Sequence, residues 1–453
     1  MVQGEVLAKS WFLPHIRRKD FASFCRIITS KHKDKRKAKS NMHVIQPALI
    51  SYEHFVSEGN DNQRLVMVLS ALNVDALIYK LDLERNGRRN KYPNRMLWNT
   101  LVAAKVYGIA TVSSLVRELS RNPELREICG VLSVPKGYHY SRFISKLARP
   151  ENQEMLAQAF HVTVEKLREI LPDLGKSIAL DGTAVSSYCN RFRKDKTDKD
   201  AGWGVRTKRR EDGHEDKDLW YGYNLMLAVD TKYEVPLGYE VIPANVNESP
   251  RLPVVLGEVK RRHPQLKTDY VMADAGFDSG DNCRFVLNEL EALPVIKMRL
   301  TQEKDKEFKS AMCRCNELGT PICDCGGYMR YAGRDGRYLK FRCPKHVEVR
   351  GGLCSDSSYG RVLKVAITED ERRWPGLHRE SKKWARLYKR RTAVERVNGR
   401  LKEHLQLDDE YVRGIGKITV NATLSLLVML AGALAMAQKE RWKDLRRVVR
   451  LAA

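Results

Sequence analysis

The sequence is short of acidic residues for a protein of its length. It contains 56 Asp and Glu against 81 Lys and Arg, so the formal net charge is +25 over 453 residues. This imbalance favours a polyanionic partner, and we expect nucleic acid ahead of an anionic membrane. A chain of this length predicts two or three domains, with enough residues to bury a sizeable core.

We also expect no secretory signal, because about the first twenty residues contain no continuous apolar segment of the required length. Six of the ten cysteines are bunched between Cys313 and Cys354. Together these two features predict a reducing, cytoplasmic environment.

Charge is absent from residues 418–437, a run with about the length of a membrane span. The run nevertheless contains Thr419, Asn421, Thr423 and Ser425 among its small apolar residues. A helix that is apolar all round is also typical of a buried core helix, and we expect that structure here rather than a membrane span.

The most informative feature that is present is the stretch 388–402, with the sequence YKRRTAVERVNGRLK. Apolar residues recur around it at helical spacing and predict one buried face: Trp384, Leu387, Val394, Val397, Leu401 and Leu405. A second, polar face borders the first and contains Tyr388, Arg391, Glu395, Asn398 and Lys402. This arrangement favours a carboxylate held at the edge of a core between basic groups, although a solvated charged face would give the same spacing.

Two upstream segments supply further carboxylates. SIALDGTAVSS (177–187) and YVMADAGFDS (270–279) each begin with a short apolar run that ends at Asp181 or Asp274. Each predicts a buried strand with an aspartate near its end, although Asp-Gly after a strand is also a common turn. With Glu395 they make three carboxylates, which repel one another unless cations neutralise them. Hard oxygen ligands of this kind select Mg²⁺ or Mn²⁺.

These residues resemble the motifs of a known family. The spacing Tyr388-x2-Arg391-x3-Glu395-x6-Lys402 is similar to the Tyr-Arg-Glu-Lys signature of DDE transposases from bacterial insertion sequences. Asp181-Gly-Thr and Asp274-Ala-Gly-Phe resemble the two aspartate motifs of that family, and the resemblance covers about residues 90–440. It implies an α/β fold with a ribonuclease-H-like mixed sheet, and two Mg²⁺ or Mn²⁺ ions held by Asp181, Asp274 and Glu395.

The resemblance also implies an activity and its partners. The protein would cut and join double-stranded DNA, at the transposon ends and in the target, as a homodimer in the bacterial cytoplasm without a membrane. Arg391 and Lys402 would contact phosphates of the end DNA, with Tyr388 beside them. One departure concerns the second strand, where relatives often carry Gly-Tyr-Lys-x-His and this chain has GYNLM at 222–226. Two alternatives stay open: a nuclease of the same fold that cuts without joining, and a DNA-binding regulator with a vestigial triad.

The chain divides into five predicted segments. They are a basic flexible tail (1–45, with Met42 as an alternative start), a helical DNA-binding domain (46–172), the first part of the ribonuclease-H-like core (173–300), a cysteine-rich insertion (301–380), and the catalytic helix with C-terminal helices (381–453). In the helical domain, Arg117, Arg121, Arg142 and Lys146 are candidate phosphate contacts.

Within 173–300, antiparallel strands followed by strands separated by helices predict a mixed sheet. The first and fourth predicted strands would then lie side by side and bring Asp181 and Asp274 together. The charged segment 191–218 predicts a mobile loop that either borders the active site or is simply solvated.

The cysteine-rich insertion lacks the usual C-x2-C pair, and both of its local pairs are C-x-C. PICDCGG and FRCPK nevertheless resemble the two turns of a zinc ribbon, each with thiols followed by Gly or Pro. The predicted ligand set for Zn²⁺ is Cys323, Cys325, Cys343 and Cys354, with His346 as a substitute for the last. Reduced thiols without metal are the alternative.

Overall fold

The computed structural model describes residues 61–85, 91–209, 215–300, 307–344, 354–355, 357, 359–408 and 411–447. The predicted tail (1–45), the alternative start Met42 and the substitute ligand His346 lie outside these residues.

Helices occupy most of residues 61–170, as the apolar periodicity predicts. At Asn122 one helix ends and the next begins, because the Asn122 side chain accepts the N–H of Leu125 and Pro123 occupies the first turn. The helices bury Trp98, Phe143 and other apolar side chains in a shared core. They are α2 (Asp61–Ala71), α3 (Asp75–Leu83), α4 (Asn94–Val106), α5 (Val112–Arg121), α6 (Pro123–Cys129), α7 (Gly137–Leu147) and α8 (Pro150–Ile170).

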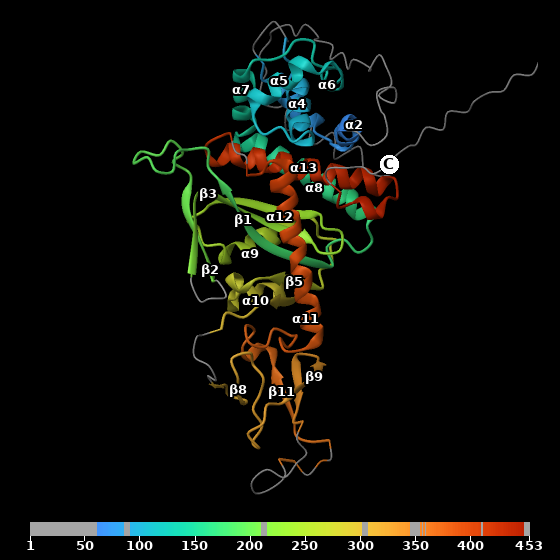
Figure 1. Cartoon of the computed structure of the whole chain (residues 1–453). Helices are drawn as coiled ribbons and strands as arrows, with labels where there is room; N and C mark the ends of the chain where they lie inside the picture. Colours follow the sequence, from blue (N-terminus) through green and yellow to red (C-terminus); the bar gives the residue numbers. More distant parts are fainter. Residues whose placement is uncertain are drawn as a thin grey trace, which may run out of the picture. The chain divides into compact units, whose positions relative to one another are not determined.

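A mixed sheet follows the helices, which confirms the predicted α/β class (Figure 1). Its strands are β1 (Ser177–Ser186), β2 (Gly202–Arg209), β3 (Glu215–Asp230), β4 (Pro236–Pro243), β5 (Tyr270–Ala273) and β6 (Leu293–Ile296). The order is β2-β3-β1-β5-β6, and β4 also pairs with β3. β1 is antiparallel to β3 and parallel to β5, so the first and fourth predicted strands are neighbours, as expected.

The prediction of a mobile loop over 191–218 is wrong for its second half. Residues 202–209 form β2, which pairs with β3 in a hairpin that places Trp203 opposite Tyr221 and Val205 opposite Leu219. The high charge of the segment conceals this alternation of aromatic and β-branched residues, which stabilises cross-strand pairs.

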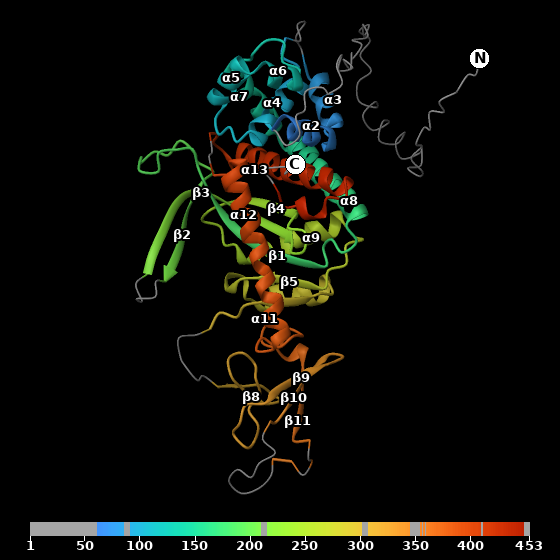
Figure 2. The same ribbon diagram turned by 45° about the vertical axis from the view of Figure 1, so that its right-hand side comes forward.

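Further helices pack against the sheet. α9 (Leu252–Arg262) contacts β4, and α10 (Gly280–Arg284) follows β5. The catalytic helix predicted at 384–405 is interrupted, because a 3₁₀ turn at Lys389–Arg391 separates α11 (Lys382–Tyr388) from α12 (Thr392–Leu405). α12 contacts β1 and β3, and both views show it crossing the sheet (Figures 1 and 2). The predicted buried stripe of α12, from Val394 to Leu405, is confirmed.

The uncharged run 418–437 forms most of α13 (Ile415–Gln438). The helix is long and apolar enough to cross a membrane, with a mean hydropathy of 1.9 over its best window, but 89% of that window is buried. It packs against α8, α2 and β4. The prediction of a buried core helix is therefore confirmed.

The cysteine-rich segment forms small sheets of its own. They contain β7 (Phe308–Lys309) with β8 (Arg314–Cys315), and β9 (Arg330–Asp335), β10 (Tyr338–Arg342) and β11 (Val362–Ala366) in the order β11-β10-β9. A separate apolar cluster that includes Leu339, Phe341 and Trp374 lies at its centre. The Trp374 indole N–H donates to the Gly319 carbonyl at 2.7 Å.

Candidate active site

Asp181 lies within β1 and not at its end, because the strand continues to Ser186. One of its carboxylate oxygens accepts the N–H of Gly182 at 2.9 Å. Burial, reinforced by the charge of Asp274 and opposed by Arg391, raises the pKa of Asp181 to about 7. Even beside Arg391, this carboxyl group is therefore only partly ionised at neutral pH, and a further cation would favour its ionised form.

Asp274 directly follows β5, whose last residue is Ala273. Its carboxylate accepts the N–H of Gly276 at 2.7 Å and so caps the short 3₁₀ turn Ala275–Phe277. The parallel register pairs Ala179 with Met272, and two residues further along this register Asp181 comes beside Asp274. The structure therefore brings the two predicted aspartates together.

Glu395 joins them through Arg391. The Arg391 Nη2 donates to Glu395 Oε1 at 2.5 Å, and its Nη1 lies 3.5 Å from Asp181 Oδ2. A single guanidinium thus lies between two of the three carboxylates. The Tyr388 ring centroid is 5.8 Å from the Arg391 guanidinium carbon, and the ring stacks on Trp384 at 4.8 Å.

Lys402 is further away, about two turns or 10 Å along α12 from Glu395. Its Nζ lies 3.2 Å from Asp408 Oδ2, and the other oxygen of Asp408 accepts the N–H of Ser186. The polar face thus holds Tyr388, Arg391 and Glu395 at the aspartates, while Lys402 lies beside the end of β1.

A fourth carboxylate near the site, that of Glu248 in the segment after β4, was not predicted from the sequence. A Cβ atom on Gly182 would lie 2.8 Å from the Glu248 carboxylate, so a larger residue next to Asp181 would displace that carboxylate. Burial raises the pKa of Glu248; Arg206 opposes this rise, and the charge of Asp274 adds to it. Its position in the sequence could have identified Glu248, because it is the first carboxylate after the third predicted strand (235–245).

Asn224, on β3, stands where relatives often carry the lysine of Gly-Tyr-Lys-x-His. It is 3% exposed, and its side-chain N–H donates to Glu248 Oε1 at 2.8 Å. The position where relatives carry a basic residue therefore orients a carboxylate in this chain. Arg206, on β2, donates to the carbonyl of Gly182 at 3.5 Å, so the charged hairpin borders the candidate site as one of the two interpretations predicted.

The donor set fits a hard divalent cation, because the partly buried carboxylates offer only oxygen ligands. A bound cation would also stabilise the ionised form of Asp181, whose pKa is raised. The carboxylates converge less closely than the cysteines do. In the described part of the chain, the one group of three or more His, Cys, Asp or Glu whose ligand atoms all lie within 4.8 Å of one another is Cys323, Cys325, Cys343 and Cys354.

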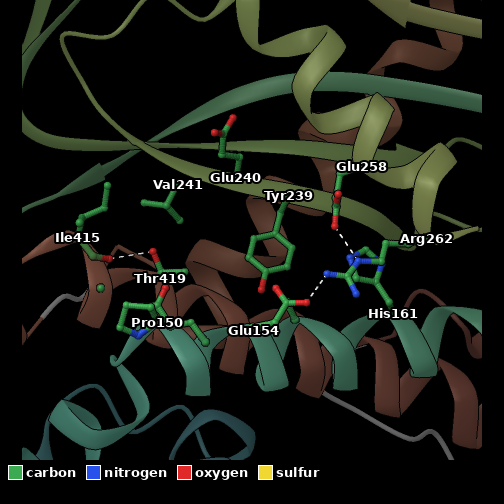
Figure 3. A pocket seen from close by; sticks show the side chains of 13 residues that line it. Pro150, Glu154, His161, Tyr239, Glu240, Val241, Glu258, Arg262, Ile415 and Thr419 are labelled. Carbon is green, nitrogen blue, oxygen red and sulfur yellow. Dashed lines mark hydrogen bonds and ion pairs between the residues drawn. The ribbon is translucent and has the colours of Figure 1, made fainter. Parts of the chain in front are cut away.

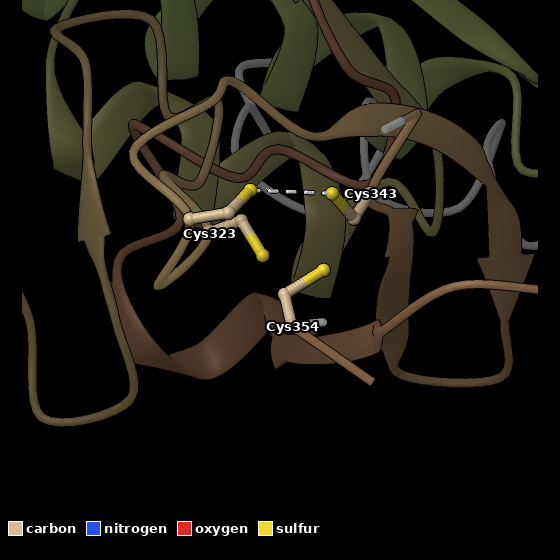
Figure 4. Close-up of side chains that lie close together, drawn as sticks. Cys323, Cys343 and Cys354 are labelled. Carbon is tan, nitrogen blue, oxygen red and sulfur yellow. Dashed lines mark hydrogen bonds between the residues drawn. The ribbon is translucent and has the colours of Figure 1, made fainter. Parts of the chain in front are cut away.

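The cysteine cluster joins two turns of the insertion. Cys323 and Cys325 belong to the turn between β8 and β9, Cys343 directly follows β10, and Cys354 comes from the segment before β11. The sulfurs of Cys323, Cys343 and Cys354 point toward a common centre (Figure 4), and the Cys325 and Cys343 sulfurs are 3.6 Å apart. The structure brings together all four predicted ligands.

A cavity of about 500 Å³ lies elsewhere, lined by residues of α8, β4, α9 and α13. Glu154 and Glu258 both pair with Arg262 at its edge (Figure 3). Burial lowers the pKa of His161 to about 3, so this histidine is neutral beside His263. The cavity contains none of the predicted site residues, and its charged lining residues are all engaged in ion pairs, Glu154 and Glu258 with Arg262 and Glu240 with Arg251.

Two family models agree with the transposase motifs. Residues 175–431 match the family model described as a transposase DDE domain, and residues 51–146 match a transposase domain, DUF772. A solved structure, the cryo-EM structure of a piggyBac transposase synaptic complex with hairpin DNA, is 10% identical, with a TM-score of 0.38 over 86% of this chain and 79% of that chain. No protein of curated function matches the sequence. Because the first match spans more than half of the 453 residues, the chain belongs to the transposase DDE domain family.

Proposed function

We propose that this transposase cuts insertion-sequence ends and joins them to target DNA with Asp181, Asp274 and Glu395 as its catalytic residues. The observation that carries the proposal is the convergence of these residues. Parallel pairing of β1 with β5 sets the aspartates side by side, and Arg391 links Asp181 to Glu395 on α12. The order β3-β1-β5-β6, with β4 also paired to β3, supports a ribonuclease-H-like core for this chemistry.

The three carboxylates would hold Mg²⁺ or Mn²⁺, two ions per site by family resemblance. Such ions would neutralise charge on the scissile phosphate and acidify an attacking water or 3′-hydroxyl. The protein contributes the fixed position of the ligands: Asp181 is held by the sheet, and Asp274 by the turn that it caps. Glu248 adds a further carboxylate beside Gly182.

The predicted signature residues would contact the DNA. Arg391 lies beside the carboxylates, so its guanidinium group could leave them and bind a phosphate near the cut. A planar guanidinium group binds phosphate with two parallel hydrogen bonds, which an ammonium group does not. Lys402 would contact the backbone further along α12, and Tyr388 would pack beside Arg391.

A basic cavity in the helical region supports DNA binding there as well. It measures about 680 Å³, and its lining includes Arg85, Lys91, Lys136, Arg142 and Lys146 without any carboxylate. Two of the four predicted phosphate contacts, Arg142 and Lys146, thus lie together. Arg121, in contrast, pairs with Glu118. We expect the DNA complex to contain a homodimer and to form in the bacterial cytoplasm.

A strand-transfer assay with labelled end DNA tests the catalytic assignment. Asp181→Asn, Asp274→Asn and Glu395→Gln should each abolish cleavage in Mg²⁺, because each removes an anionic ligand. Glu240→Gln is the matched control, since Glu240 pairs with Arg251 outside the site. Full activity in any triad variant would remove that residue from the site. Cleavage without joined products would instead support the nuclease alternative.

For the insertion we propose one structural Zn²⁺, held by Cys323, Cys325, Cys343 and Cys354. Four thiolates at tetrahedral spacing are typical of structural zinc sites, and a small sheet with a limited core gains stability from one. Protein purified without chelator should contain about one zinc per chain. Cys343→Ser should lose it, whereas Cys189→Ser, at an isolated cysteine, should retain it. Zinc-free parental protein would favour unliganded thiols.

A further inference from the structure

Exposed aromatic and apolar side chains gather on the β2–β3 hairpin and on the segment 187–200 that precedes it. Phe192 is 83% exposed, Tyr188 55%, and Trp203 42%. Val205 and Leu219 are more than half exposed beside them. Soluble surfaces rarely leave such side chains together without a partner.

A cation accompanies each aromatic side chain of this surface. Arg191 lies 5.0 Å from the Phe192 ring centre, and Arg413 lies 5.4 Å from that of Tyr188. Lys196 lies 5.6 Å from the Trp203 ring centre and 5.2 Å from that of Tyr221. Alternation of aromatic platforms with basic groups is what sequence-tolerant binding of unpaired nucleic acid requires.

Hydrogen bonds to a buried aspartate and to the hairpin hold this surface in place. Asp198 is 2% exposed, accepts from the hydroxyls of Ser187 and Tyr223, and its carbonyl accepts from the Tyr221 hydroxyl. Arg191 donates to the Leu219 carbonyl at 3.1 Å and so ties the segment to the hairpin.

The surface continues from the candidate active site. Trp203 pairs with Tyr221, and Asp181 pairs with Leu227 further along β3. Leu227 comes six positions after Tyr221, an even spacing, so their side chains share one face of the sheet, about 20 Å apart along the strand. Asp408 lies in the same direction from the site, where it joins Lys402 to the end of β1.

We propose that this surface, defined by Tyr188, Phe192, Trp203 and Tyr221 with their cations, binds unpaired nucleobases of the DNA strand next to the cut. The inference rests on the proposed DNA-cutting function and adds a site for bases released from pairing. About 20 Å corresponds to roughly six base-pair steps, so the bound bases lie a few nucleotides from the cut.

Charge favours this occupant over a second copy of the chain. Residues 187–200 contain Arg191, Arg193, Lys194, Lys196 and Lys199 against three aspartates. Two of these aspartates are engaged internally, Asp198 as above and Asp200 with the Ile415 N–H. The same basic surface on a second copy would repel this one, whereas a DNA strand complements it.

Binding of two labelled probes, followed by fluorescence anisotropy, tests the proposal. The probes are an oligothymidylate and a fully paired duplex, each of about 20 nucleotides per strand, a length that covers typical single-strand site sizes. Phe192→Ala and Trp203→Ala should each weaken oligothymidylate binding by about fivefold or more, as expected when one stacked base is lost. Trp203→Phe should retain most of the affinity, and duplex affinity should change less than twofold.

Tyr359→Ala is the matched control. Tyr359 is 50% exposed and lies 4.6 Å from the Arg342 guanidinium, but it belongs to the cysteine-rich segment. Equal affinity of all variants for oligothymidylate would overturn the proposal, as would an equal loss on both probes. If Phe192→Ala or Trp203→Ala changes the sedimentation of the DNA-free protein but not its oligothymidylate binding, the surface binds a second copy of the chain and the proposal is wrong. These results do not depend on cleavage, so they are separate from a failure of the catalytic assignment.

Discussion

Replacing Asp181 by Asn should stabilise the protein when no metal is bound. The pKa of this carboxyl group rises from 3.8 to about 7 on folding, because of its burial first and the charge of Asp274 second. Above pH 4 the unfolded chain releases this proton more readily than the folded protein does. The free energy of unfolding therefore falls as the pH rises from about 4 to 7, and the full cost is present above pH 7.

The size of the effect follows from the shift. About three pKa units correspond to about 4 kcal/mol, and the Asp181 side chain is only 19% exposed, so solvent screens little of it. The shift already includes the attraction between Asp181 and Arg391, so the loss of that contact in asparagine is not a separate cost. We therefore expect a gain of about 4 kcal/mol at pH 8, falling to about 2 kcal/mol at pH 5.

Urea unfolding in chelator at the two pH values measures this gain. Asp281→Asn is the control, because Asp281 is 89% exposed and should change the free energy of unfolding by less than about 0.5 kcal/mol. Saturating Mg²⁺ should stabilise the parent more than Asp181→Asn, since only the parent retains the full ligand set. A variant that is less stable than the parent at pH 8, or a gain that does not depend on pH, would refute the electrostatic account of the site.

Three further predictions concern neighbouring residues. The buried Glu234 side chain, 1% exposed, pairs with Arg396, Arg400 and Arg446. Glu234→Gln should therefore lower the free energy of unfolding, measured in urea, by about 2–4 kcal/mol. Glu289→Gln, at an exposed pair with Lys260, should leave it unchanged. Glu248→Gln should weaken Mn²⁺ binding measured by calorimetry, and unchanged affinity would exclude Glu248 as a ligand. Arg391→Ala and Lys402→Ala should each flatten the log–log salt dependence of end-DNA binding by about 0.9, measured with Ca²⁺ in place of Mg²⁺. Parental slopes in both would contradict their assignment to phosphates.

Much of the core could be predicted because its signals are local. The apolar runs before Asp181 and Asp274 encode strands, and the order of strands and helices implies that these two strands are adjacent. The 3.6-residue period of α12 likewise encodes which side of the helix is buried. The 3₁₀ turn before Thr392 could not be seen, because Lys389 to Arg391 fit a continuous helix equally well.

What the sequence did not reveal depends on contacts between distant segments. Glu248 comes close to Asp181 only because the segment after β4 folds back onto Gly182. The β2 hairpin is hidden by charges that lie in the same segment as Trp203 and Val205. The contact of Arg391 with both Asp181 and Glu395 likewise requires the packed position of α12.

The central claim is that Asp181, Asp274 and Glu395 form one metal site that acts on DNA. The most direct measurement is a crystal structure of the protein with end DNA and Mn²⁺, in which anomalous scattering locates each ion. The account predicts Mn²⁺ in contact with all three carboxylates and with a DNA phosphate, and Arg391 displaced from between Asp181 and Glu395. Mn²⁺ bound elsewhere, with Arg391 still bridging the two carboxylates in the presence of DNA, would contradict it.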